Sequence, residues 1–393
     1  MKASWVWGLM MAITFAIPAK AGISTVQVPF YSDIMAITYE SDVLKYVPSG
    51  KFTTASPGAF RVAMNKGSIQ VLMGSLLAKK QNMELNDWLY FVLVKNTVDK
   101  IMPSQTDHAR VMMTWYLMAR SGYQVKLLHD RQRPWLYAAF EDKVYEVAYV
   151  EMDEGKFINL TGFFEPEDKR QFVIYDSEEL FNPSAKVFDF TMKNLPVMQA
   201  PTLIKKTLSF TYDGKVHNIP VTGDKKMAGV WHTYPKLSLY TYTRVPLSGS
   251  AYNSVIPALR KALEGKDTYT SVRMLLSFTR QAFAYETDAA GYNERELVLT
   301  PEQTLLAPYS DCEDRAVLFY YLVKELLGLD AVFIDFPTHV AVAVGMNETY
   351  GLTFDFKNRK YTFCEPTGPQ DVLEIGQLSK NYSAKTASVL KDE

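Results

Sequence analysis

The chain has 393 residues, of which 48% are hydrophobic, and its 42 basic and 43 acidic side chains give a formal net charge of −1. This length is sufficient for two or three packed domains. The balanced charge, without a basic run, excludes the extended cationic surface of a nucleic-acid-binding protein or of one held on anionic lipid.

The first 21 residues have the pattern of an export signal. Lys2 supplies a positive charge, the stretch from Trp5 to Ile17 is apolar, and Ala19-Lys20-Ala21 is a small-x-small cleavage site. A membrane-spanning helix needs about 20 apolar residues, and no stretch of the chain reaches that length. We therefore expect residues 1–21 to be a signal peptide and the mature protein to be periplasmic or extracellular, without a transmembrane segment. An uncleaved membrane anchor is the alternative.

The pattern of the next part predicts an α+β domain over residues 22–170 and a small antiparallel β-domain over 171–249. In the first, helices are predicted at 64–80, 88–100 and 110–121, and strands at 125–128, 135–140, 144–150 and 157–160. In the second, polar and apolar residues alternate at 206–212, 216–221 and 237–245.

Residues 250–393 are predicted to form another α+β domain, again with helices first and an antiparallel sheet afterwards. Helical periodicity covers 252–285 with a stop at Gly265, and another helix runs from Cys312 to Gly328. Strands are predicted at 331–336, 340–344, 353–356 and 361–365, the last two joined as a hairpin.

The two α+β parts follow the same order, which suggests two copies of one domain. When Gly122 is aligned with Gly328, similar apolar patterns precede both glycines, and Thr106 takes the position of Cys312. The first part contains no cysteine, so as a copy it would be a scaffold or a substrate-binding module. Two unrelated α+β units with ordinary helix-strand order remain the alternative.

Cysteine, histidine and a carboxylate lie at the ends of predicted elements in the last domain. Cys312 begins a helix, His339 begins a strand, and Glu365 closes another strand. Side chains at the ends of regular elements can be aimed and held. We expect Cys312 to be a thiol nucleophile, His339 its base, and Glu365 the group that orients the base.

The sequence around Cys312 favours a reactive thiol. Ser310 with Glu313 fits a capping box, which places Cys312 in the first helical turn, where backbone N–H groups and the helix dipole favour the thiolate. The acidic neighbours raise the pKa of a thiol, so we expect them to point away, cap the helix or pair with Arg315. The alternatives are a buried structural cysteine or a disulfide with Cys364, the other cysteine of the chain. If Glu365 faces the site, however, Cys364 points to the opposite side of the sheet.

The histidine and the glutamate also have ordinary interpretations. A lone histidine on an apolar strand is commonly a satisfied core residue, and a glutamate at the end of a strand is commonly an exposed turn residue. Ala341 and Ala343 share the face of His339 and leave room for a ligand. No zinc-ligand spacing, P-loop or dinucleotide fingerprint is present, so we expect neither a metal nor a cofactor.

These motifs together resemble the core of the transglutaminase-like superfamily. The resemblance lies in Asp-Cys-Glu-Asp-Arg-Ala at 311–316, Pro-Thr-His at 337–339 and Cys-Glu-Pro-Thr at 364–367, with weaker likeness at 283–288 and 300–305, and it covers about residues 250–375. It implies a papain-like fold in which Cys312, His339 and Glu365 form the catalytic triad. Members of the family act on amides of peptides or protein side chains as cross-linkers, peptidases or amidases.

Two departures from the family pattern bear on the reaction. The third residue of the family is usually aspartate, whereas Glu365 is one methylene longer, and Glu313 and Val340 stand where many cross-linking members carry tryptophan. Without aromatic residues to keep water from an acyl-enzyme, hydrolysis is favoured over cross-linking. Gln303 or Tyr309 is the candidate side chain for the oxyanion. The sequence thus predicts an exported cysteine hydrolase acting on peptides or proteins, with a cross-linking acyltransferase or a non-catalytic envelope scaffold as alternatives.

Overall fold

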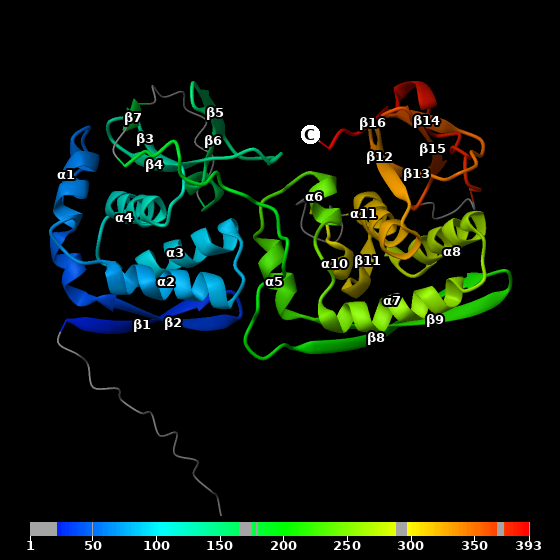
Figure 1. Ribbon diagram of the computed structural model, residues 1–393, viewed down its shortest axis with the longest axis horizontal. Helices are drawn as coiled ribbons and strands as arrows, with labels where there is room; N and C mark the ends of the chain where they lie inside the picture. Colours follow the sequence, from blue (N-terminus) through cyan, green and yellow to red (C-terminus); the bar gives the residue numbers. More distant parts are fainter. Residues whose placement is uncertain are drawn as a thin grey trace, which may run out of the picture.

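The computed structural model describes residues 22–48, 50–164, 175–177, 180–287, 297–367 and 373–392, so the expected signal peptide lies outside the described residues. The protein is α+β, as predicted, and its two lobes lie side by side (Figure 1). Within the ranges just given, no helix has the length and apolar character required to cross a bilayer.

The N-terminal lobe begins with a hairpin and ends with a five-stranded antiparallel sheet, with helices between them. The hairpin is β1 (Ile23–Phe30) and β2 (Asp33–Glu40). The short helix η1 (Ser41–Tyr46) follows, then α1 (Ser56–Met64), α2 (Gln70–Asn82), α3 (Asp87–Ile101) and α4 (Asp107–Arg120). The sheet has the order β5-β6-β4-β3-β7, formed by β3 (Val125–His129), β4 (Pro134–Ala139), β5 (Tyr149–Met152), β6 (Gly155–Asn159) and β7 (Tyr175–Ser177), with η2 (Thr161–Phe164) after β6.

The C-terminal lobe also begins with a hairpin, β8 (Leu203–Tyr212) and β9 (Lys215–Asp224). Its helices are α5 (Lys226–His232), α6 (Leu239–Thr243), α7 (Gly249–Leu263), α8 (Thr268–Gln281), α10 (Pro301–Leu306) and α11 (Cys312–Leu322), which continues into the π-helix η3 (Val323–Leu327). The short strands β10 (Ala284–Tyr285) and β11 (Tyr309–Ser310) pair in parallel. The sheet has the order β14-β15-β13-β12-β16, formed by β12 (Asp330–Phe336), β13 (His339–Gly345), β14 (Thr353–Phe356), β15 (Arg359–Cys364) and β16 (Ser388–Val389), with η4 (Ala384–Thr386) before β16.

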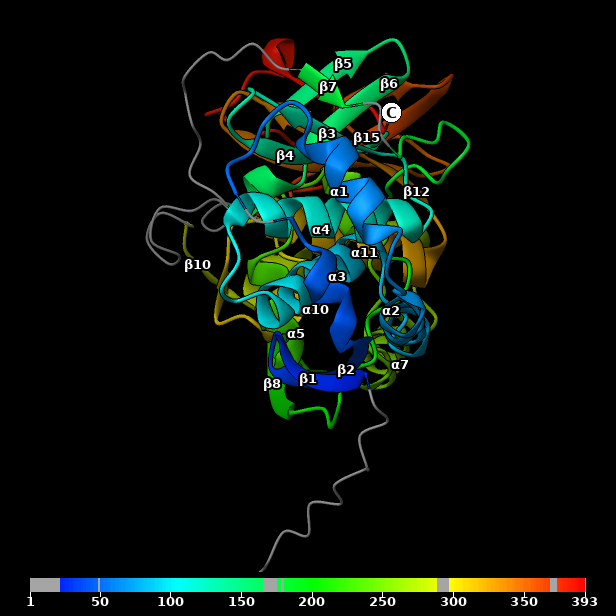
Figure 2. The same ribbon diagram turned by 90° about the vertical axis from the view of Figure 1, so that its left-hand side faces the viewer.

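The two lobes share one arrangement. In the N-terminal lobe, α2 packs on β2, α3 on β1, and α4 on β3 and β4; in the C-terminal lobe, α7 packs on β9, α8 on β8, and α11 on β12 and β13. The two sheets have matching strand orders. Figure 2 shows both hairpins at one side of the molecule and both sheets at the other. The two lobes therefore share the order of their elements along the chain, as the sequence suggested, and also the way in which those elements pack.

The π-helix corrects the register between the two lobes. Helix α4, and helix α11 with its continuation η3, are each followed by a glycine in the left-handed conformation. These are Gly122 (φ 89°) and Gly328 (φ 63°). A π-turn holds one residue more than an α-turn, so η3 adds a residue before Gly328 that α4 lacks. Counted from the first helical residue instead, Asp107 corresponds to Cys312. The prediction that Thr106 occupies this position is thus wrong by one residue.

The predicted antiparallel β-domain over 171–249 is not a separate unit. Its hairpin, β8–β9, packs on α7 and α8 of the C-terminal lobe, and β7 pairs with β3 of the N-terminal lobe. The predicted strand at 237–245 contains helix α6, which Ser238 caps by accepting a hydrogen bond from Thr241 N. The predicted helix at 64–80 is divided into the end of α1 and α2.

Candidate active site

Cys312 is the first residue of α11, in the first helical turn, as predicted. The capping box differs from the predicted one by one position. Asp311 is the N-cap and accepts from Asp314 N (3.4 Å), while the Asp314 carboxylate accepts from Asp311 N (3.3 Å). Ser310 instead accepts a hydrogen bond from the buried guanidinium of Arg315 (3.0 Å). The two carboxylates of the box are thereby used to begin the helix.

Glu313 lies against the thiol, contrary to the expectation that the acidic neighbours point away. The Cys312 Sγ donates to Glu313 Oε2 at 2.6 Å. Burial of the sulfur, followed by the charge and hydrogen bond of Glu313 and the charge of Asp311, raises the pKa of Cys312 well above its usual range. The helix terminus contributes only about half a positive charge. A full negative charge in contact with the sulfur outweighs it, so the thiol is protonated in this arrangement, and the prediction of a lowered pKa is wrong for it.

His339 and Glu365 meet where β13 begins and β15 ends, although 26 positions separate them in the sequence. His339 Nε2 lies 2.7 Å from Glu365 Oε2, and both side chains are buried. The register explains the contact, because Val342 pairs with Cys364, which leaves Glu365 just beyond β15 beside the start of β13. The other carboxylate oxygen, Oε1, accepts from Thr367 N (2.9 Å). Glu365 is therefore held at both oxygens and fixes the orientation of the imidazole, with Nδ1 as the second ring nitrogen.

Helix α11, which begins at Cys312, packs on β13 (Figure 1). The backbone N–H of Val340, the residue after His339, donates toward the Cys312 sulfur and opposes the rise in its pKa. Among the hydrogen bonds of the described residues, however, the thiol proton goes to Glu313 and not to His339. The structure thus pairs His339 with Glu365 and turns the thiol of Cys312 to Glu313, with the backbone N–H of Val340 on the side of His339.

Two tyrosines border this site: Tyr285, which lies in the stretch 283–288 of weaker family likeness, and Tyr382, which the sequence did not single out. The ring of Tyr382 stacks on His339, with centroids 4.7 Å apart and planes 14° apart. Burial raises the pKa of Tyr285 to about 12, and the neighbouring Cys312 adds to the rise because a negative sulfur would oppose a second negative charge. Tyr382 is not adjacent in the sequence to any residue of the motifs. The two tyrosines supply aromatic surface near His339 and the sulfur.

Two arginines, buried Arg315 and partly buried Arg280, connect the elements that carry the site. Arg315 donates to the carbonyl oxygens of Phe283 (2.9 Å) and Thr367 (2.9 Å), in addition to Ser310. Arg280, near the end of α8, donates through Nε to the carbonyl oxygen of Glu365 (2.8 Å). These contacts connect α8, α11 and the turn after β15. Arg315 is therefore a structural cation and does not neutralise Glu313 through any hydrogen bond in the described structure.

The remaining predicted residues have structural roles. Cys364 is a buried free thiol whose Sγ lies 3.6 Å from Thr362 O, and burial raises its pKa to about 12. It is packed among the residues between the sheet and the helices, on the face opposite Phe363, as strand geometry predicted. The side-chain oxygen of Gln303 caps α10 by accepting from Thr300 N (2.9 Å), and Tyr309 lies in β11. The donor to the sulfur among the contacts described above is the backbone N–H of Val340.

Comparison of the chain with protein-family models, with curated proteins and with solved structures finds no match in any of the three.

Proposed function

We propose that the protein is an exported thiol hydrolase of the transglutaminase-like kind, which cleaves amide bonds of peptides or protein side chains. The observation that carries this proposal is the contact of 2.7 Å between buried His339 and Glu365, formed beside Cys312 at the start of α11. A carboxylate that orients an imidazole next to a thiol is the arrangement required for nucleophilic acyl transfer.

In the proposed reaction, Cys312 attacks the carbonyl carbon of the amide after its proton passes to His339 Nδ1. His339 then gives the proton to the leaving amine, and a thioester remains on Cys312. Water, deprotonated by the same imidazole, attacks the thioester and releases the acid and the thiol. Glu365 stays ionised and stabilises the imidazolium. The N–H of Val340 and the first N–H groups of α11 are the candidate donors to the tetrahedral oxyanion.

The reaction requires the thiol to leave Glu313. A rotation of the Cys312 side chain about its Cα–Cβ bond is a motion that side chains make quickly. The short hydrogen bond to Glu313 therefore describes a resting state, in which the protonated sulfur is held beside the base that would activate it.

The shared arrangement of the lobes supports a further part of the proposal. We take the C-terminal lobe as a papain-like, transglutaminase-type catalytic domain and the N-terminal lobe as a degenerate copy. Corresponding strand orders and helix contacts support a common origin. Asp107 in place of Cys312 removes the nucleophile from the N-terminal copy.

One observation favours acyl transfer to an amine as a second candidate function. Tyr285 and Tyr382 border the sulfur, and aromatic surface that keeps water from a thioester gives an amine time to react. The same triad would perform both reactions, and the products differ. A free acid indicates hydrolysis, and a new amide indicates transfer.

The test uses the full mature chain and a set of glutamine-containing peptides, analysed by mass spectrometry with and without a primary amine. We expect a mass change at an amide that is lost in Cys312→Ala and kept in Cys364→Ala, the matched control at the other cysteine. Full activity in Cys312→Ala would refute the thiol mechanism. Absence of any product, together with absence of labelling of Cys312 by a thiol-reactive amide probe, would support the non-catalytic scaffold instead.

A further inference from the structure

The N-terminal lobe contains a cavity of about 620 Å³ at the place that corresponds to the triad. Its lining includes Asp107 at the first position of α4, Arg133 just before β4 and Thr161 just after β6. In the other lobe, Cys312, His339 and Glu365 lie at the start of α11, the start of β13 and the end of β15. The volume is in the range of small-ligand pockets, about 300–1,000 Å³.

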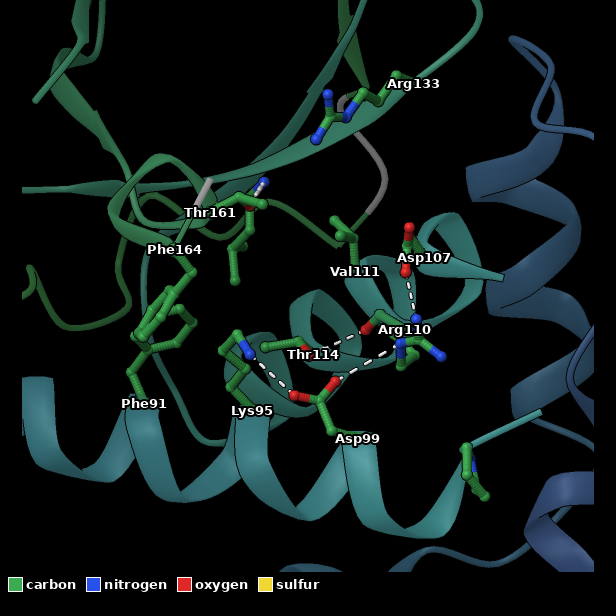
Figure 3. A pocket seen from close by; sticks show the side chains of 12 residues that line it. Phe91, Lys95, Asp99, Asp107, Arg110, Val111, Thr114, Arg133, Thr161 and Phe164 are labelled. Carbon is green, nitrogen blue, oxygen red and sulfur yellow. Dashed lines mark hydrogen bonds and ion pairs between the residues drawn. The ribbon is translucent and has the colours of Figure 1, made fainter. Parts of the chain in front are cut away.

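The charged side chains on one wall form a line of alternating sign (Figure 3). Lys95 Nζ donates to Asp99 Oδ2 (2.8 Å), Asp99 Oδ1 lies 3.6 Å from Arg110 Nε, and Arg110 donates to Asp107. Asp99 and Arg110 therefore each contact two charged neighbours of opposite sign. Lys95 ends the line as a cation with three donors, and Asp107 ends it as a carboxylate whose side chain is 82% exposed.

Apolar side chains complete the cavity. Phe91, Val111, Leu136 and Phe164 line it, and the ring of Phe164 lies 4.8 Å from Lys95 Nζ. Figure 3 shows Phe91 and Phe164 beside the Lys95 end of the charged line. A ligand in this cavity thus meets a positive end, a negative end and an apolar surface.

We propose that this cavity binds a short unblocked peptide, with its terminal carboxylate at Lys95 and its terminal ammonium at Asp107. A ligand with a single charge could pair with one end of the line only and would leave the other end with just its neighbour in the line. A zwitterion satisfies both ends, and an apolar side chain of the peptide packs on Phe91 and Phe164. Binding is non-covalent, because none of the described residues that line the cavity carries a thiol or an imidazole. This site is separate from the proposed triad and does not depend on its activity.

The experiment is isothermal titration calorimetry of the full mature chain with the tripeptide alanyl-phenylalanyl-alanine. The same peptide is then titrated with an acetylated amino end, and again with an amidated carboxyl end. We expect saturable binding of the free peptide and a loss of about tenfold or more in affinity for each blocked form, equivalent to about 1.4 kcal/mol. Cys312→Ala should bind the free peptide unchanged, which separates this site from the triad.

The variants assign each end of the peptide. Lys95→Met should abolish only the preference for a free carboxyl end of the peptide. Asp107→Asn should abolish only the preference for a free amino end. General destabilisation of the protein would not separate the two preferences. Val111→Trp should block binding by filling the cavity. Lys193→Met is the matched control, because Lys193 also pairs with an aspartate four residues away, outside this cavity. The proposal is overturned by absence of saturable binding at millimolar peptide, by equal binding of the blocked peptides, or by loss of binding in Cys312→Ala.

Discussion

Replacing Glu313 by Gln removes the negative charge that lies against the Cys312 thiol and keeps a side chain of similar size. In the present arrangement the carboxylate accepts the thiol proton at 2.6 Å and raises the pKa of Cys312. A thiolate reacts with an alkylating reagent, whereas a thiol does not. Below the pKa the reaction rate is therefore proportional to the thiolate fraction, and lowering the pKa raises the rate at any fixed pH.

The size of the effect follows from the charge that is removed. Two unit charges about 4 Å apart repel by about 1 kcal/mol in water and by about 4 kcal/mol at an effective dielectric constant of 20. Each 1.36 kcal/mol is a factor of ten in the ionisation constant. Because Cys312 is partly buried, between these limits, Glu313→Gln should accelerate alkylation at one pH by about five- to a thousandfold.

The assay measures iodoacetamide labelling of Cys312 by mass spectrometry from pH 6 to pH 9, in a Cys364→Ala background. Glu348→Gln is the control, since Glu348 is an exposed glutamate whose carboxylate accepts from Tyr350 OH. The labelling rate of the unsubstituted site should rise about tenfold per pH unit across this range. Equal rates for Glu313→Gln and Glu348→Gln would show that the contact does not control the thiol, and would contradict the resting state described above.

Substitutions at three other positions test the proposed triad and its surroundings. Glu365→Gln keeps the shape but removes the charge that orients His339, so amide turnover should fall by about a hundred- to ten-thousandfold while the far-UV circular dichroism is unchanged; turnover within twofold would exclude the orienting role. Tyr382→Ala removes the ring stacked on His339 and should lower kcat, whereas Tyr382→Phe should keep it, and equal loss in both would mean that the hydroxyl acts instead. Arg315→Met leaves the carbonyl oxygens of Phe283 and Thr367 without their donor. The free energy of unfolding in urea should therefore decrease by about 3–5 kcal/mol. A decrease below about 1 kcal/mol would contradict the structural role of Arg315.

Local patterns in the sequence were sufficient to predict the elements that carry the site. The helix beginning at Cys312, the strand beginning at His339 and the hairpin of β14 and β15 all lie close to their predicted bounds. A helix start and a strand with a two-residue period are specified by neighbouring residues. For the same reason, the strand period also predicted that Cys364 faces away from Glu365.

Contacts between distant parts of the chain were decided only by the tertiary structure. The β8–β9 hairpin is part of the C-terminal lobe because it packs on α7 and α8. The sequence of the hairpin does not specify which helices cover its buried face. Tyr382 reaches His339 from beyond β15, at a separation with no sequence period.

The state of the thiol depends on geometry in the same way. The sequence shows that Glu313 follows Cys312, but a neighbouring carboxylate can cap a helix, face solvent or contact the sulfur. Its side-chain direction follows from the capping box of Asp311 and Asp314, which leaves Glu313 outside the cap and against the sulfur. Residue types and their spacing therefore determined which chemistry the chain can assemble. The packing of the helix on the sheet determined the charges that surround it, because electrostatic energies depend on distances of a few ångströms.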